Sequence, residues 1–375
     1  MQEGALLALA AKGILIAAVP LLYVWRSRAV DKARKLAWVT VFLTFDLILL
    51  GGFTRLTDSG LGCPDWPGCY GNSNPLSAGE SIRAAESAQP TGPVTMGKAW
   101  VEMLHRYFAL AVGVLIVVLL ALAWRRQTGD RSKSAALATL VFTWVCMQGA
   151  FGAWTVTQKL QPIIVTAHLL GGMTLLGLLV WLALRESRVQ PVANGVTLRG
   201  IGALALVALT LQIVLGGWVS SNYAVMACPD FPLCQGSLAP PDMDFANGFT
   251  LWRNLGMTGG DGARPIPFQA LVAIHWAHRS FAFVAAAAVG WLALRAYRCP
   301  GTQRAGTWLF LMLVLQLLTG MSNVIFQWPL LLAVLHNGGA AALLALVVGL
   351  NYCARQAQTR RVGAREQSAP DRAAG

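Results

Sequence analysis

The chain contains 375 residues, of which 56% are hydrophobic and 12% are charged, and its formal net charge is +13. Because soluble domains carry about 25% charged residues, this composition excludes a soluble globular protein. The basic residues are not interleaved with aromatic residues as in nucleic-acid-binding proteins, so we expect no nucleic-acid partner.

Long apolar blocks recur along the chain and predict an all-α, polytopic membrane protein. A helix needs about 20 apolar residues to cross the hydrocarbon core of a bilayer. Nine blocks meet this length, near residues 5–24, 36–56, 100–124, 135–157, 162–184, 199–220, 269–294, 307–326 and 330–353. We therefore predict nine transmembrane helices.

The first block resembles a signal peptide in its position, but two features argue against one. Lys12 lies in its middle, and no small-x-small cleavage site follows it. We expect residues 1–35 to form an extra, retained span that runs from outside to inside, followed by a basic cytoplasmic loop.

The distribution of charge predicts the orientation. Segments 26–35, 125–134, 185–199, 295–306 and 354–375 contain 20 of the 29 basic residues and 5 acidic residues, whereas the long loops 57–98 and 221–268 contain 8 acidic and 4 basic residues. By the positive-inside rule, the first set is cytoplasmic and the long loops are outside. Residues 354–375 are then a cytoplasmic tail, and the surplus basic residues can also bind anionic membrane lipid.

An internal repeat divides the rest of the chain into two halves. Residues 49–71 align without a gap to residues 214–236, LHRYFA at 104–109 repeats as AHRSFA, and the segment from Gln148 to the Gly-Gly after His168 repeats from Gln316. The offsets are 165, 173 and 168, and four spans separate each feature from its copy. This pattern predicts two parallel four-helix bundles, 36–184 and 185–353, related by an axis along the membrane normal.

The repeat places two histidines in each half. They are His105 and His168 in the first half, and His278 and His336 in the second. His168 follows Pro162 by six residues and His336 follows Pro329 by seven, which is about 10 Å along a helix and places them in the outer leaflet. Two imidazoles at matching depth on different helices are the usual means of holding a haem iron. Interhelical hydrogen bonds, or a zinc site that would need further ligands, are the alternatives.

Charged residues beside the histidines extend the haem interpretation. Arg106 and Arg279 could offset the charge of haem propionates, or simply extend toward lipid headgroups. Glu102 precedes His105 by three residues, and the corresponding position before His278 is His275. A carboxylate beside one haem only would supply a proton acceptor or stabilise positive charge, unless it is merely solvated at the membrane surface.

Four of the seven cysteines occupy two loops of the form Cys-Pro-Asp-aromatic-Pro-x-Cys on the expected outer side. The pairs are Cys63 with Cys69 and Cys228 with Cys234. Disulfides persist in that compartment. Spacing favours structural disulfides over redox-active ones, but leaves both open.

Taken together, these motifs resemble the haem A synthase family. The resemblance rests on TRLTDSGLG with its cysteine pair, Glu-x-x-His-Arg at 102–106, the second His-Arg, and the His-x-x-Gly-Gly and His-x-Gly-Gly motifs, and it covers about residues 40–353. It implies oxidation of the C8 methyl group of haem O to the formyl group of haem A for cytochrome oxidase assembly, in the inner membrane of a bacterium. The family has eight spans, so the block at 5–24 is a departure.

The resemblance also implies a role for each half. His105 and His168 would hold the substrate haem with Glu102 assisting its oxidation, while His278 and His336 would ligate a permanent haem b. The cysteine pairs would take part in electron or haem handling. Haem O synthase (protohaem farnesyltransferase) and cytochrome oxidase assembly factors are the expected partners, and a homo-oligomer is left open.

Two histidines on the substrate iron leave no position for oxygen, so we hypothesise that one of them is displaceable.

Two other functions remain as alternatives. A bis-histidine dihaem cytochrome b that relays electrons would not need Glu102. A parallel-repeat transporter would have broken helices near the middle of the membrane.

Overall fold

The computed structural model describes residues 2–126, 132–189, 192, 195–253 and 266–367. The elements of this part of the chain are all helical. Nine of its helices are long and apolar enough to cross a membrane, and each coincides with one of the predicted blocks. The prediction of an all-α, multi-pass membrane protein is therefore confirmed.

Four helices of the first half pack in a closed ring. They are α2 (Lys32–Leu56), α4 (Met96–Arg125), α5 (Ser132–Thr157) and α6 (Pro162–Glu186). α2 and α5 each contact both α4 and α6. Local signals begin these helices: Asp31 and Thr95 accept hydrogen bonds from backbone N–H groups three residues later, and Pro162 occupies the first turn of α6.

The helices of the second half make the same contacts in the same order. They are α7 (Arg199–Ser221), α9 (Phe268–Arg298), α10 (Gln303–Ile325) and α11 (Leu330–Gln367). α7 and α10 each contact both α9 and α11. α11 continues well beyond the predicted end of its span at residue 353, and the last residues of the predicted tail, 368–375, lie outside the described residues.

The two rings meet along α2, α6, α7 and α11. Glycines allow this close approach. A methyl group added to Gly52 of α2 would overlap the side chain of Asn337 on α11, and one added to Gly217 of α7 would lie 2.9 Å from Leu169 of α6. The two contacts are equivalent in the sequence repeat, because Gly217 follows Gly52 by 165 residues and Asn337 follows Leu169 by 168 residues.

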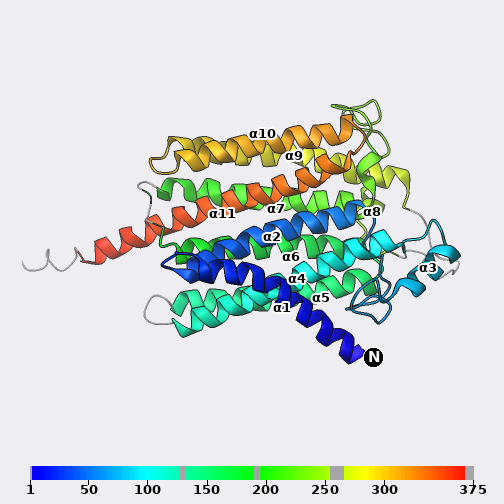
Figure 1. Cartoon of the computed structure of the whole chain (residues 1–375). Coiled ribbons are helices and arrows are strands. Elements are labelled where there is room, and N and C mark those ends of the chain that lie inside the picture. Colours follow the sequence, from blue (N-terminus) through cyan, green and yellow to red (C-terminus); the bar gives the residue numbers. More distant parts are fainter. Residues whose placement is uncertain (1, 127–131, 190–191, 193–194, 254–265, 368–375) are drawn as a thin grey trace, which may run out of the picture.

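Helix α1 (Gln2–Arg26) lies outside both rings and packs mainly on α4 (Figure 1). A Cβ atom on Gly13 would lie 2.7 Å from Leu110 Cβ, so the two helices touch closely. Lys12, in the middle of α1, donates hydrogen bonds to the carbonyl and hydroxyl oxygens of Ser73 at 2.7 and 2.9 Å. α1 is thus anchored to the first long loop as well as to α4.

The two long loops lie at the same end of the molecule, opposite the end from which α11 projects (Figure 1). They contain the short helices α3 (Gly79–Ala88) and α8 (Phe245–Gly248), which the sequence analysis did not predict. Residues 254–265 of the second loop lie outside the described residues.

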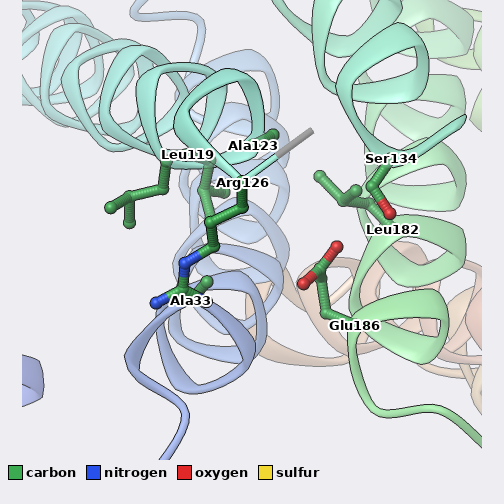
Figure 2. A pocket seen from close by; sticks show the side chains of 8 residues that line it. Ala33, Leu119, Ala123, Arg126, Ser134, Leu182 and Glu186 are labelled. Carbon is green, nitrogen blue, oxygen red and sulfur yellow. The ribbon is translucent and has the colours of Figure 1, made fainter. Parts of the chain in front are cut away.

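A small cavity lies near the opposite end of the first ring, and Figure 2 shows Arg126 and Glu186 entering it from different sides. Arg126 also forms an ion pair with Asp31 at 3.1 Å. Leu119, which lines the cavity, is about 20 Å along α4 from His105. This cavity is therefore separate from the histidines.

Candidate haem-binding site

The structure places the four predicted histidines on equivalent helices of the two rings. His105 is on α4, His168 on α6, His278 on α9 and His336 on α11. All four are partly buried, and the two imidazoles of each half are close enough to interact electrostatically. Among the described residues, no three His, Cys, Asp or Glu side chains are grouped so as to hold a metal ion. The histidines therefore lie as two pairs, one in each ring.

A glycine on a neighbouring helix faces each imidazole. A Cβ atom would lie 3.0 Å from the ring carbon Cε1 at three of these glycines, and 3.6 Å from it at the fourth. The pairs are Gly51 with His105, Gly152 with His168, Gly216 with His278 and Gly320 with His336. At the three closer glycines a larger residue would crowd the ring, so Gly51, Gly216 and Gly320 limit the position of their imidazoles, whereas Gly152 leaves room for a methyl group beside His168.

Buried polar atoms without partners add to the evidence for a bound group. His105 Nδ1, His168 Nδ1 and both side-chain polar atoms of Gln148 are buried, and no hydrogen bond to them is formed within the described part of the chain. Unpaired buried polar groups are costly, so they commonly mark a ligand site. The paired imidazoles of both halves, together with these unpaired atoms in the first half, fit a haem in each half, since a porphyrin needs only two axial ligands from the protein.

Arg106 and Arg279 bind the loops that contain the cysteines. Arg106 donates hydrogen bonds to the carbonyl oxygens of Asp65, Pro67 and Gly68 at 3.0, 3.1 and 2.6 Å. Arg279 does the same to Asp230 and Pro232 at 2.9 and 3.1 Å. Their predicted binding of haem propionates stays a prediction, and their observed contacts hold the loops on α4 and α9.

Glu102 is 4% exposed, so the alternative that it is solvated at the membrane surface is wrong. Its carboxylate accepts a hydrogen bond from the backbone N–H of Cys63 at 2.8 Å and forms an ion pair with Arg106. His275 occupies the equivalent place, where its Nδ1 accepts a hydrogen bond from the N–H of Cys228 at 3.3 Å. The two residues anchor corresponding loops, but only Glu102 contributes a negative charge.

Both predicted disulfides are present, between Cys63 and Cys69 and between Cys228 and Cys234. In each loop, an aspartate side chain accepts hydrogen bonds from two backbone N–H groups. In the second loop, Asp230 accepts them from Gln235 and Gly236 at 2.9 and 2.8 Å. The Gly236 bond is the main cause that lowers the pKa of the Asp230 carboxyl. Gly236 has a φ of +74°, a conformation that favours glycine.

Two polar residues beside the second histidine pair were missed by the sequence analysis. The amide of Gln212 lies 3.1 Å from His278 Nδ1, and the hydroxyl of Thr319 lies 3.1 Å from His336 Nδ1. A signal for them existed in the repeat. The aligned positions of the first half, Leu47 and Phe151, are apolar, so these are polar residues that one half has and the other lacks.

The fold and site define a polytopic helical membrane protein with a histidine pair in each of two helical rings. Comparison with known proteins gives the family. The family model for COX15-CtaA, described as cytochrome oxidase assembly protein, matches residues 34–348. The chain belongs to this family.

Relatives named heme A synthase cover most of the chain. The one from Shewanella oneidensis is 39% identical over 85% of this chain and 96% of its own length. Those from Erythrobacter litoralis and Rhodopseudomonas palustris are 30% and 28% identical, over 82% and 86% of this chain and 92% and 91% of their own lengths.

Proposed function

We propose that this protein is a haem A synthase, an enzyme that oxidises the C8 methyl group of haem O to the formyl group of haem A for cytochrome oxidase assembly. Membership of the family and the names of its relatives support this activity. The observation that carries it is the buried carboxylate of Glu102, which is one helical turn from a histidine pair in the first half and is replaced by His275 in the second.

The substrate haem is assigned to residues 36–184 and a permanent haem b to residues 185–353. His105 and His168 would hold haem O, and His278 and His336 would hold haem b. Bound haem b would supply one-electron transfer, which amino-acid side chains cannot provide. The protein's own contribution is to fix His105, His278 and His336 closely against glycine and to exclude water from Glu102.

Glu102 would act on the charge that develops on the reacting methyl carbon. A carboxylate buried in a region of low dielectric stabilises a nearby positive charge more strongly than one in water. Its bonds to Cys63 N–H and Arg106 hold it in place before the reaction. Arg106 and Arg279 remain proposed partners for propionates at the loop end of each ring.

The two rings are proposed to be duplicated parallel four-helix bundles. Their matching contacts, the equivalent glycine contacts between them and the sequence repeat support this relationship. The proposed location is the bacterial inner membrane, with the disulfide loops outside and the C-terminus in the cytoplasm, because the basic residues are concentrated at the opposite end. Haem O synthase and oxidase assembly factors remain the proposed partners.

Mass analysis of the porphyrins extracted by acid from the purified protein tests this function. We expect protohaem together with the farnesylated haems O and A in the wild type. His105→Ala should lose the farnesylated haems selectively, and His278→Ala should lose haem b. Two identical haems in the wild type, with neither O nor A type present, would instead identify an electron-relaying cytochrome b.

A further inference from the structure

The two histidine pairs differ in what holds the imidazole rings. In the second half, His278 Nδ1 and His336 Nδ1 each lie 3.1 Å from a polar side chain, Gln212 and Thr319 respectively. In the first half, the Nδ1 atoms of His105 and His168 are buried, and no group within the described ranges forms a hydrogen bond with them. The Nδ1 atoms therefore have polar neighbours in the second half and none among the described residues of the first.

The residues that replace Gln212 and Thr319 in the first half cannot take over this task. Leu47 packs among the apolar side chains of the first ring. Phe151 packs edge to face on Trp154, with ring centres 5.2 Å apart. Neither side chain has a hydrogen-bond acceptor, so the difference is built into the sequence rather than into the local conformation.

The hydrogen bond to Nδ1 matters for metal binding. A ligating histidine that donates its other ring N–H to an acceptor keeps its orientation and becomes a stronger ligand, and losing the acceptor typically costs 10- to 100-fold in metal affinity. Thr319 is suited to accept, because its own hydroxyl hydrogen can go to the Leu315 carbonyl oxygen, 3.0 Å away. Gln212 acts differently: its amide nitrogen donates to the His278 carbonyl oxygen at 3.1 Å and faces Nδ1 from there, so it positions the ring and backbone of His278 without accepting from Nδ1.

We propose that Thr319 and Gln212 are positioning residues that make the second half the permanent haem site, and that the absence of such partners makes the first half an exchangeable site. This inference rests on the proposed function only in naming the exchangeable haem as substrate and product. A site that must take up one haem and release another benefits from weaker axial ligation, and a weakly held histidine is also the one that can be displaced.

Haem transfer from the purified full-length protein to excess apomyoglobin tests the proposal. In a His105→Ala background, which leaves the second site loaded, Thr319→Val should increase the rate of haem loss about 10-fold. It should also raise the reduction potential of that haem, because a weaker imidazole donor stabilises ferric iron less. Thr319→Ser, which restores the hydroxyl, should restore both values. Thr307→Val, at an exposed position of the same helix, is the matched control.

The wild-type background gives a second measurement that needs no ligand variant. Haem loss should occur in a fast and a slow phase, and Thr319→Val and Gln212→Leu should accelerate only the slow one. In a His278→Ala background, Phe151→Thr should slow haem loss from the first site, whereas Phe151→Leu should not. Unchanged rates and potential in haem-loaded Thr319→Val and Gln212→Leu proteins would overturn this inference and leave the proposed function intact. Only a wild-type protein that binds no haem would overturn both.

Discussion

Glu102 and His275 perform the same structural task with different side chains. Each is buried one turn before the first histidine of its half, and each accepts the backbone N–H of the first cysteine in the adjacent loop. Because the anchoring is shared, the negative charge is what distinguishes the two positions. Substitution at these sites can therefore separate loop anchoring from chemistry.

Replacing Glu102 by Gln or Ala is expected to leave haem bound and to stall oxidation, with a partly oxidised haem accumulating. Gln keeps an acceptor for the Cys63 N–H, so its effect reports the loss of charge. Removing one group that stabilises transition-state charge typically costs about 10²- to 10³-fold, so haem A formation should fall about 100-fold or more. Mass analysis of extracted haems measures this.

His275→Gln is the control and should retain haem A formation. A normal haem A yield in Glu102→Ala would remove Glu102 from the mechanism.

The glycines that face the imidazoles offer a second residue-level comparison. Gly320 and Gly152 are equivalent in the repeat, but a Cβ atom would lie 3.0 Å from His336 at the first and 3.6 Å from His168 at the second. Gly320→Ala should therefore displace His336 and lower the amount of haem bound by the second half, while Gly152→Ala should be tolerated. The pyridine haemochrome spectrum measures both. Equal haem content in the two variants would show that ring clearance does not control binding.

At the level of helices, the spans could be predicted because apolar length alone determines them in a bilayer. α3 and α8 could not, because they are short, lie in polar loops and depend on tertiary contacts. The four histidines and Glu102 could be found from the repeat. The sequence could not predict which groups bind Arg106 and Arg279. It also could not predict the polar neighbours of His278 and His336. Both depend on groups contributed by other elements of the fold.

The first disulfide loop contacts α4 at Gly62, and this contact leads to a prediction about stability. A Cβ atom on Gly62 would lie 2.5–2.6 Å from the backbone of Lys98 and Ala99, which cannot move aside as a flexible side chain can. Gly62→Ala should cost about 1–3 kcal/mol by overpacking. Gly97→Ala, one residue before this contact, has no atom within 4 Å and should be neutral or slightly stabilising.

Thermal unfolding of both variants in detergent is the appropriate measurement. We expect a lower midpoint for Gly62→Ala and an unchanged or higher midpoint for Gly97→Ala. If Gly62→Ala unfolds at the wild-type temperature, the loop does not pack on α4 as described.

On the scale of the whole molecule, orientation in the membrane decides which compartment each site faces. The histidines fall within the first 11 residues of α4, α6, α9 and α11, whereas Arg125, Arg185 and Arg298 lie in the last turns of α4, α6 and α9. The disulfide loops precede α4 and α9, at the end opposite the one from which α11 projects (Figure 1). With the proposed orientation, haem would be handled near the outer surface, where disulfides persist. The halves also meet at this end: Arg55 near the end of α2 donates a hydrogen bond to Ser220 O near the end of α7, and Tyr223 of the second loop donates one to Asp58 of the first.

Reporter fusions test this orientation. Alkaline phosphatase inserted at Leu238, which is 74% exposed in the second disulfide loop, should be active, because that enzyme folds only outside the cytoplasm. The same insertion at Val30, which is fully exposed between α1 and α2, should be inactive. A fluorescent protein fused after Gly375 should fluoresce. The opposite pattern would reverse the topology and place the haems on the cytoplasmic side.

The equivalent contacts of Gly52 with Asn337 and Gly217 with Leu169 have an evolutionary consequence. If the halves arose by duplication, the surface that now joins them is isologous, meaning that each partner offers the same patch to the other. An ancestral chain of four spans could then have assembled as a symmetric homodimer with two identical haems. Fusion of the two genes would have allowed each copy to change independently. One haem site could then become catalytic while the other kept a permanently bound haem.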